Sequence, residues 1–164
     1  MTRKVSVIMS AFNAEKTIEN SVQSILDQTF EEFEFLIVDD CSKDSTFNIL
    51  NKFSDERIKL FKNDKNLGLT KSLNFLINKS STEVIARQDA DDYSHKNRIE
   101  IQFNKLNNES IDFCITRAQN IQNDKKIPGL SYFAPYKIIY KYKNPFIHGT
   151  LMIYKESLLR VGLY

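Results

Sequence analysis

Short runs of apolar, often β-branched residues alternate with amphipathic segments along the first two thirds of the chain. Five such runs predict strands, at residues 5–9, 33–40, 57–61, 82–86 and 112–116. Between them, apolar residues recur at helical spacing in residues 13–28, 44–53, 66–80 and 95–106. Strands that alternate with helices of this length are typical of a Rossmann-like, doubly wound and mostly parallel sheet flanked by helices. We therefore expect an α/β fold of this type.

Polar and acidic residues stand where three of the predicted strands end. Residues 10–13 follow the first strand, Asp39 and Asp40 close the second, and Asp89, Asp91 and Asp92 follow the fourth. Ligands of such sheets bind outside the carboxyl ends of the strands, so these loops predict a binding crevice along one edge.

The crowded acids at residues 89–92 need an explanation of their own. Neighbouring carboxylates repel one another and are costly to desolvate unless a cation or hydrogen-bond donors offset them. We expect a cation that the sequence does not itself contain, although an acidic triplet is also consistent with a solvated turn that caps the next helix. Asp92 could help to orient the acidic site, or it could act at the N-terminus of the helix predicted at residues 95–106.

The four glycines are too scattered to form a dinucleotide fingerprint or a P-loop. A bound diphosphate would therefore need another positive charge. Mn²⁺ or Mg²⁺, held by one or two carboxylates and by phosphate oxygens, meets that need. Asp89 and Asp91 are alternate residues at a strand end, so both carboxylates are expected to face one crevice.

Composition narrows the range of functions. The 164 residues are enough for one domain, and the formal net charge of +2 gives no reason to expect a nucleic-acid partner. Cys41 and Cys114 form neither a disulfide framework nor a zinc set and are predicted to be small buried hydrophobes. No stretch is long and apolar enough to be a membrane span or a signal peptide, so a cytoplasmic location is expected.

The pattern weakens after residue 120. Residues 123–133 predict an excursion, 134–145 a short basic helix, 146–154 a strand and 155–162 a helix. The basic segment 136–143 could contact an anionic membrane surface or an acceptor, and a solvated basic helix explains it equally well.

Four segments together resemble the signatures of the inverting family 2 glycosyltransferases, which have the GT-A nucleotide-diphosphosugar fold. They are VSVIMSAFN at residues 5–13, FEFLIVDDCSKDST at 33–46, NLGLTKSLN at 66–74 and ARQDADD at 86–92, in the order expected for the family. The similarity runs from about Lys4 to Arg98 and, more loosely, through residues 148–164.

The resemblance implies roles for individual residues. Ser10, Ala11 and Phe12 would line the nucleoside pocket, Asp39 would accept a hydrogen bond from the imide nitrogen of uracil, and Asp89 would touch the ribose or the sugar. Asp91 would coordinate the metal ion on the diphosphate. Asp40 is assigned to capping or loop structure, and Arg87 is predicted to pair with the acidic cluster.

Two assignments compete with structural alternatives. Lys71 could reach the nucleotide, but a solvated lysine on a helix fits its position as well. His148 could be a late metal or phosphate ligand, as in some members of the family, or a hydrogen-bonded histidine in a strand pair.

The implied activity is metal-assisted transfer of a sugar, with inversion, from a nucleotide-diphosphate donor. UDP is the expected nucleotide, and a glycan or lipid-linked acceptor in cell-surface polysaccharide synthesis is the expected partner. We expect one domain, residues 1–164, in which residues 1–118 bind the donor and residues 119–164 begin an incomplete acceptor-side region, with peripheral contact at the inner face of the membrane. No catalytic base is identified, because the family's base usually lies beyond the counterpart of residues 161–164.

Four other classes share part of this pattern. A nucleic-acid cleavage domain could also use the Asp-x-Asp of residues 89–91 but would normally show a more basic surface. A non-catalytic nucleotide-sugar binding module or a truncated fragment is the strongest alternative, because no base is identified. A metal-dependent phosphotransferase would need a nucleophilic aspartate after the first strand, where Ser10 and Asn13 stand. A receiver domain would also have its acidic pair there.

Overall fold

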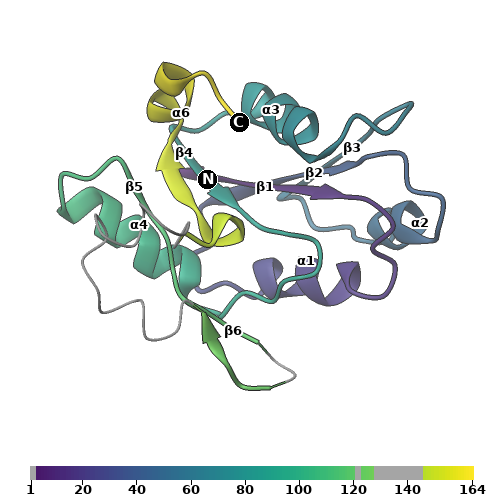
Figure 1. The fold of residues 1–164 in the computed structure, drawn as a ribbon, viewed down its shortest axis with the longest axis horizontal. Coiled ribbons are helices and arrows are strands. Elements are labelled where there is room, and N and C mark those ends of the chain that lie inside the picture. Colours follow the sequence, from purple (N-terminus) through teal and green to yellow (C-terminus); the bar gives the residue numbers. More distant parts are fainter. Residues whose placement is uncertain (1–2, 121–122, 128–145) are drawn as a thin grey trace.

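The computed structural model describes residues 3–120, 123–127 and 146–164. A six-stranded sheet with the order β3-β2-β1-β4-β8-β5 forms the centre of the molecule (Figure 1). Its strands are β1 (Val5–Ala11), β2 (Phe33–Asp39), β3 (Ile58–Lys62), β4 (Val84–Arg87), β5 (Phe113–Cys114) and β8 (Met152–Tyr154). The first four are parallel, whereas β8 runs antiparallel to both β4 and β5. The predicted α/β fold with a mostly parallel sheet is confirmed.

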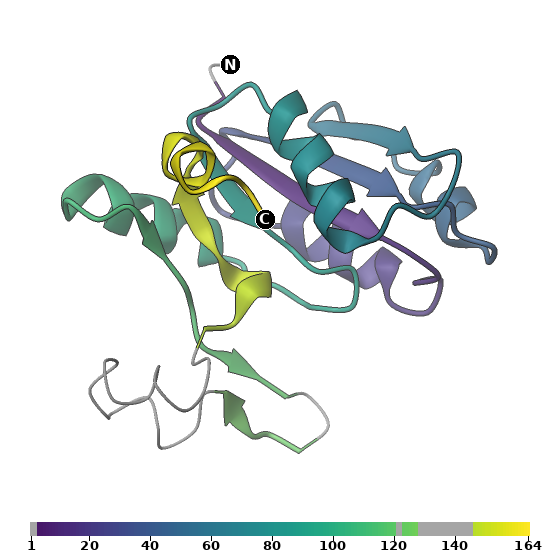
Figure 2. The same cartoon turned by 45° about the horizontal axis from the view of Figure 1, so that its top comes forward.

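Helices cover both faces of this sheet, as the two views in Figures 1 and 2 show. They are α1 (Ile18–Leu26), α2 (Thr46–Leu50), α3 (Leu69–Lys79), α4 (Arg98–Asn108) and α6 (Lys155–Val161). Apolar residues of α1, α2 and α4 pack with Val5, Val7 and Met9 of β1. Residues of α3 and α6 pack with Ile8 on the other face. A strand buried on both faces reads as a nearly continuous apolar run, and residues 5–9 show such a run interrupted only by Ser6.

The register brings the polar loops to one edge. Ala11 at the end of β1 lies opposite Asp39 at the end of β2, and Arg87 at the end of β4 lies opposite Ile8. The loops after β1, β2 and β4 therefore leave the sheet side by side, as predicted.

The opposite edge of the sheet holds a buried charge. Glu34 is fully buried and accepts hydrogen bonds from Ser6 Oγ at 2.6 Å, Lys59 Nζ at 2.7 Å and Ser81 N at 2.7 Å. Burial alone would raise the pKa of Glu34, but these donors outweigh it and lower the pKa to about 2. The carboxylate thus ties β1, β2, β3 and the loop before β4 together.

The C-terminal strands are shorter than predicted. Residues 148–150 form a 3₁₀ turn, η2 (His148–Thr150), so only Met152–Tyr154 of the predicted strand at 146–154 pairs with β4. Thr150 Oγ1 donates to Ile147 O at 2.9 Å and lies 3.1 Å from Thr116 O, which favours the turn over an extended chain. The predicted strand at 112–116 is reduced to the two residues of β5.

The remaining predictions for the second half have mixed outcomes. The helix predicted at 155–162 is confirmed as α6. Within the predicted excursion at 123–133, residues Lys126–Ile127 form β7, which pairs antiparallel with β6 (Ala118–Gln119). The predicted basic helix at 134–145, including the segment 136–143, lies outside the described residues. Within the described ranges, no helix has the length and apolar character needed to cross a bilayer.

Both cysteines differ from the prediction of full burial. Cys41 and Cys114 are each half-buried. Cys41 has a left-handed backbone with φ of 63° in the loop after β2, a conformation that non-glycine residues adopt mainly in turns. Its position is therefore set by the loop rather than by core packing.

Candidate functional site

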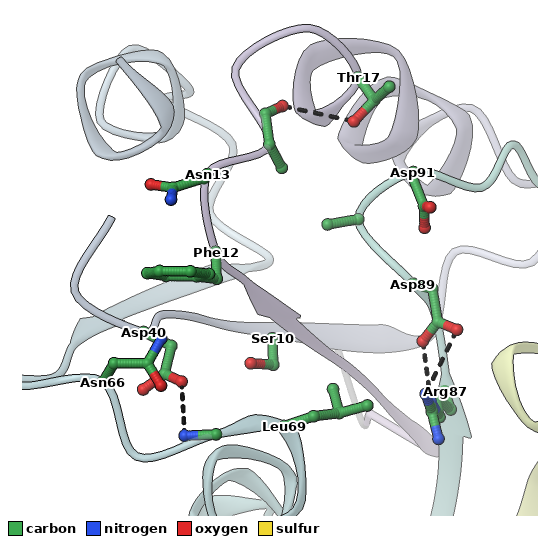
Figure 3. Close-up of a pocket in the computed structure, with 13 residues that line it drawn as sticks. Ser10, Phe12, Asn13, Thr17, Asp40, Asn66, Leu69, Arg87, Asp89 and Asp91 are labelled. Atoms are coloured by element: carbon green, nitrogen blue, oxygen red, sulfur yellow. Dashed lines mark hydrogen bonds and ion pairs between the residues drawn. The ribbon is translucent and has the colours of Figure 1, made fainter. Parts of the chain in front are cut away.

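A cavity of about 600 Å³ lies at the carboxyl edge of the sheet, a volume in the range of small-molecule sites (Figure 3). The loops after β1, β2 and β4 and the start of α3 supply its walls. The lining residues are Ser10, Phe12, Asn13, Ala14, Thr17, Asp40, Asn66, Gly68, Leu69, Arg87, Asp89, Ala90 and Asp91. Figure 3 shows Phe12, Asp40 and Asn66 on one side of the cavity and Asp89 and Asp91 on the other. The cavity thus has an aromatic side and an acidic side.

Phe12 dominates the aromatic side. Its side chain is 46% exposed and lies in the loop that follows β1. An exposed aromatic ring in a cavity offers a flat surface on which a base can stack. Ser10 lines the same cavity. Ala11 is fully buried and does not line it; its carbonyl accepts a hydrogen bond from Asp40 N at 2.8 Å.

Asp40 organises the loop that precedes α3. Its Oδ1 accepts hydrogen bonds from Leu67 N and Asn63 Nδ2, and its Oδ2 accepts one from Gly68 N at 2.8 Å. Burial opposes ionisation, but these donors outweigh it and lower the pKa of Asp40. These contacts agree with the structural role predicted for Asp40, and they place its carboxylate on the cavity wall as well.

Asp39 is fully buried and does not line the cavity. Its Oδ2 accepts a hydrogen bond from Ser42 N at 3.3 Å, whereas Oδ1 has no hydrogen-bond partner among the described residues. A buried carboxylate oxygen without a donor is costly, so this atom is suited to a donor from outside the chain.

Arg87 and Asp89 form an ion pair on the acidic side of the cavity. Arg87 Nε lies 2.8 Å from Asp89 Oδ1, and Nη2 lies 3.3 Å from Oδ2. The predicted pairing of Arg87 with the acidic cluster is confirmed. The expectation that the compensating cation is absent from the sequence is therefore wrong in part, because Arg87 supplies one positive charge.

Arg98 supplies a second positive charge behind the same loop. It is almost completely buried at the start of α4, and its Nη1 donates to Arg87 O at 3.2 Å. Burial lowers the pKa of Arg98 to about 10, which still leaves it charged at neutral pH. The sequence analysis missed this residue. The sequence does place Gln102 one helical turn after Arg98, a spacing that allows the two side chains to contact each other. Arg98 Nη1 donates to Gln102 Oε1 at 3.2 Å.

A turn, rather than a continued strand, brings Asp89 and Asp91 to one cavity. The strand ends at Arg87, and Asp92 N donates to Asp89 O at 3.2 Å.

The carboxylate of Asp92 lies among like charges. Burial raises the pKa of Asp92, and the charges of Asp89 and Asp91 raise it further. The capping role considered for Asp92 is wrong, since the residue at the N-cap of α4 is Asn97.

Gly149 lies directly against the acidic loop. A Cβ atom placed on Gly149 would be 2.7 Å from Asp89 Oδ2 and 2.9 Å from Asp92 Oδ2. Only a residue without a side chain permits this close approach of the backbone. The sequence analysis missed Gly149, because nothing local in residues 148–150 relates them to residues 89–92.

His148 and Lys71 lie apart from this arrangement. Both side chains are exposed and neither residue lines the cavity, although His148 is the neighbour of Gly149. Within the described part of the chain, no group of three or more His, Cys, Asp or Glu side chains is arranged to hold a metal ion by itself. The two carboxylates of Asp89 and Asp91 on one cavity wall nonetheless fit a hard cation that takes its other ligands from water and phosphate.

Comparison with known proteins gives the family. The profile described as Glycosyl transferase family 2 matches residues 6–163. The chain belongs to glycosyltransferase family 2. Among curated members of the family, it is 34% identical over 155 residues to the putative glycosyltransferase EpsE of Bacillus subtilis strain 168, covering 92% of the chain and 56% of EpsE.

A second relative has a more specific name. The chain is 37% identical over 158 residues to the Escherichia coli enzyme UDP-Glc:alpha-D-GlcNAc-diphosphoundecaprenol beta-1,3-glucosyltransferase WfgD, covering 94% of the chain and 61% of WfgD. This family 2 glycosyltransferase chain therefore spans about three fifths of the length of the curated relatives it matches.

Solved structures agree with the fold. The crystal structure of S. aureus TarS 1-349 in complex with UDP-GlcNAc superposes with a TM-score of 0.83 at 25% identity, covering 98% of this chain and 48% of that one. The mannosyltransferase PcManGT from Pyrobaculum calidifontis, in complex with GDP-Man and Mn²⁺, has the same fold, with a TM-score of 0.76 at 19% identity, covering all of this chain and 48% of that one. The family 2 glycosyltransferase chain thus has the GT-A fold.

Proposed function

We propose that this chain binds a nucleotide-diphosphosugar, with UDP as the nucleotide, and forms the donor site of a sugar transferase. The observation that carries the proposal is the two-sided cavity, with Phe12 on one side and the carboxylates of Asp89 and Asp91 on the other. A nucleoside diphosphate has the matching polarity, since its base is flat and its diphosphate is anionic. The UDP-GlcNAc complex of the similar protein TarS supports the choice of ligand.

The base lies on the aromatic side in this proposal. Phe12 stacks on it, and Ser10 lies beneath the nucleoside. We propose Asp39 Oδ1, which is buried and has no donor among the described residues, as the acceptor for the imide hydrogen of uracil. Because Asp39 does not line the cavity, this contact requires the loop after β2 to open when the base binds. A carboxylate accepts hydrogen bonds only, so it selects a base edge that donates.

The diphosphate and the sugar lie on the acidic side. Asp91 would hold Mn²⁺ or Mg²⁺. Asp89, whose orientation is fixed by Arg87, would accept hydrogen bonds from hydroxyl groups of the ribose or the sugar. When bound, the metal ion supplies a positive charge against the departing diphosphate. His148 is the first residue of η2, and we propose it as a metal or phosphate ligand. Lys71 lies on α3, and we propose that it reaches the nucleotide.

We propose that the reaction is displacement at the anomeric carbon with inversion, as the resemblance to the inverting members of the family suggests. An acceptor hydroxyl attacks and gives its proton to a base that is not assigned among the described residues, and the nucleoside diphosphate leaves from the opposite side. We propose a glycan or lipid-linked acceptor in cell-surface polysaccharide synthesis, in keeping with the diphosphoundecaprenol in the name of WfgD. Residues 1–118 would carry most of the donor site and residues 119–164 would begin the acceptor side, with the reaction on the cytoplasmic face of the membrane.

A thermal-shift panel tests the donor assignment. UDP, GDP, CDP and ADP are each added with and without Mn²⁺ or Mg²⁺, and UDP with Mn²⁺ is expected to give the largest shift. A ligand at one hundred times its dissociation constant stabilises the folded state by about 2.7 kcal/mol, which raises Tm by roughly 5 to 10 °C in a domain of this size. Equal shifts with every nucleotide would contradict the role of Asp39. Hydrolysis is measured separately, with a UDP-sugar and Mn²⁺. Binding of the UDP-sugar without hydrolysis above background would favour a non-catalytic binding module.

A further inference from the structure

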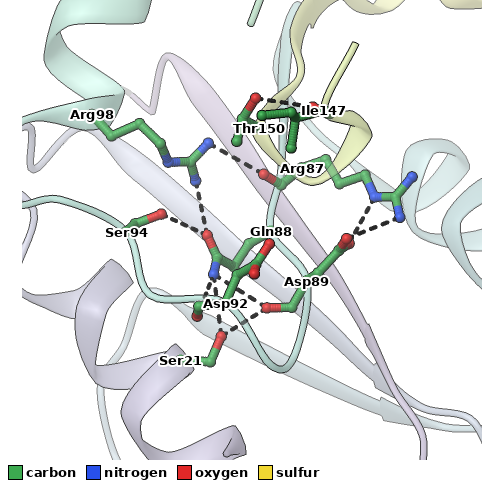
Figure 4. A network of polar contacts seen from close by, with 9 residues as sticks. All are labelled: Ser21, Arg87, Gln88, Asp89, Asp92, Ser94, Arg98, Ile147 and Thr150. Atoms are coloured by element: carbon green, nitrogen blue, oxygen red, sulfur yellow. Dashed lines mark hydrogen bonds and ion pairs between the residues drawn. The ribbon is translucent and has the colours of Figure 1, made fainter. Parts of the chain in front are cut away.

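Gln88 lies at the centre of a buried polar network behind the acidic loop (Figure 4). The residue follows β4 directly and is 2% exposed. Its side-chain amide Nε2 donates to Asp92 O at 2.8 Å and to Asp89 O at 3.2 Å. Its Oε1 accepts hydrogen bonds from Ser94 Oγ at 2.6 Å and Arg98 Nη2 at 3.1 Å. One side chain therefore contacts the loop at both of its ends.

These contacts fix the main chain that carries the acids. Asp89 O also accepts a hydrogen bond from Ser21 Oγ at 2.9 Å, which attaches this carbonyl to α1. Gln88 N donates to Ile8 O at 3.0 Å, so the glutamine backbone is in turn attached to β1. The loop itself belongs to no helix or strand, so its shape depends on these bonds.

Charge repulsion acts against that shape. Three carboxylates within residues 89–92 lower their mutual energy by moving apart. Arg87 offsets the charge of Asp89, but its guanidinium is not a donor to the carbonyls of the loop. Ser21 Oγ also donates to Asp89 O, but among the described side chains only the amide of Gln88 donates to the carbonyls of both Asp89 and Asp92.

We propose that Gln88 is a positioning residue for the donor site, which holds residues 89–92 so that the carboxylates of Asp89 and Asp91 face one cavity. Its identity as glutamine matters because the amide both donates to the loop and accepts from Ser94 and Arg98. The ligand named for those carboxylates rests on the function proposed above, whereas the shape of the loop does not.

Gln28 provides a matched control. It is also buried, at 4% exposure, and its Nε2 donates to Ser24 O and His95 O at 2.9 Å each. Its Oε1 accepts a hydrogen bond from Ile99 N at 2.9 Å. Gln28 thus joins α1 to α4 with similar bonds, but none of these partners lies in residues 87–92.

The experiment compares Gln88→Met with Gln28→Met in the full chain, with Gln88→Glu as a second variant. Gln88→Glu keeps an acceptor for Ser94 and Arg98 but loses the donor to the loop. The first readout, without ligand, is the NMR shift of the carboxyl carbons of Asp89, Asp91 and Asp92 and the amide exchange of residues 89–92. We expect both Gln88 variants to change these signals and Gln28→Met to leave them as in the wild type.

The second readout is UDP affinity with and without Mn²⁺. We expect the Gln88 variants to lose at least about 10-fold in the Mn²⁺-dependent affinity and to keep the metal-free affinity within about twofold, in line with other residues that orient metal ligands. Loop signals that are unchanged in the Gln88 variants, or changed equally in Gln28→Met, would overturn the proposal. If the wild type shows no Mn²⁺-dependent UDP binding, the donor assignment fails, and the ligand-free readout still decides the role of Gln88.

Discussion

Arg87 Nε lies 2.8 Å from Asp89 Oδ1 at the end of β4, where both residues line the cavity. The arginine side chain is 8% exposed and the aspartate 30%, so the pair is largely shielded from water. The crowded acids are therefore partly compensated by the chain itself before any ligand binds. A cation bound from solution would act mainly on Asp91, which is exposed on the same cavity wall.

Arg87→Met should destabilise the protein. The change leaves Asp89 beside Asp91 and Asp92 without its guanidinium, and removal of one partner of a shielded pair costs far more than removal of a surface charge. We expect the free energy of unfolding in urea to fall by about 2 kcal/mol at neutral pH. Lys105→Met is the control, because its ion pair with Glu109 is about half exposed and its loss should cost under about 0.5 kcal/mol. Equal losses in the two variants would refute the argument.

Asp91→Asn should remove the metal dependence of donor binding. An amide is a weaker ligand than a carboxylate for a hard cation, and Asp91 is the exposed carboxylate on the cavity wall. Calorimetric titration with UDP should show at least about a 10-fold loss of affinity with Mn²⁺ and little change without it. Asp64→Asn, on an exposed residue that does not line the cavity, serves as the control. A full Mn²⁺ effect in Asp91→Asn would place the metal elsewhere.

Asp39→Asn should alter the choice of base. The substitution replaces an acceptor by a group that also donates, so the imide hydrogen of uracil would meet an N–H in one orientation. We expect UDP affinity to fall by about 10- to 100-fold, which corresponds to about 1–3 kcal/mol. The preference for UDP over CDP should fall with it in a competition assay.

The neighbouring variant Asp40→Asn should behave differently. Asp40 accepts from two main-chain N–H groups, so an amide in its place loses acceptors for the loop before α3. We expect a loss of about 1–2 kcal/mol in unfolding free energy and no change in base preference. A change of base preference in Asp40→Asn alone would reverse the assignment of the two aspartates.

Gly149→Ala should disturb the acidic loop without straining the backbone. The new Cβ would lie 2.7 Å from Asp89 Oδ2 and 2.9 Å from Asp92 Oδ2, so both carboxylates must move. We expect about a 5-fold or greater loss of Mn²⁺-dependent UDP affinity, in line with a misplaced ligand group. In a double-mutant cycle with Asp92→Ala, part of this loss should be recovered, with a coupling of about 0.5–3 kcal/mol. Additive effects would show that the contact is unimportant.

Glu34→Gln should remove part of the acid dependence of stability. The folded-state pKa of Glu34 is about 2, below the ordinary 4.5, so its contribution is fully present above about pH 4.5 and is lost as pH falls toward 2. At neutral pH the contribution is about 2–3 kcal/mol, since Lys59 is 43% exposed and water weakens the pair. Wild type and variant should converge in urea unfolding near pH 2. Glu32→Gln, on a residue 40% exposed, should change little at any pH.

The parallel half of the fold followed from local pattern. Apart from Ser6 and Glu34, residues 5–9 and 33–38 are apolar on both faces, as strands buried between two helical layers require. The antiparallel strand β8 was overestimated in length because hydrogen bonds from Gln102 and Thr116 to Thr150 stop it, and those residues are distant in sequence.

The sequence by itself determined which residues stand at the carboxyl ends of β1, β2 and β4, and therefore that acids and an aromatic ring share one edge of the sheet. That information is local, because apolar runs and amphipathic segments are recognised from neighbouring residues and their alternation predicts a mostly parallel sheet. Only the tertiary structure decided that Asp39 is buried while Asp40 lines the cavity, and that Arg98, Gln88 and Gly149 surround residues 89–92. Those contacts join segments that are far apart along the chain, so they depend on how the helices and the turn pack onto the sheet.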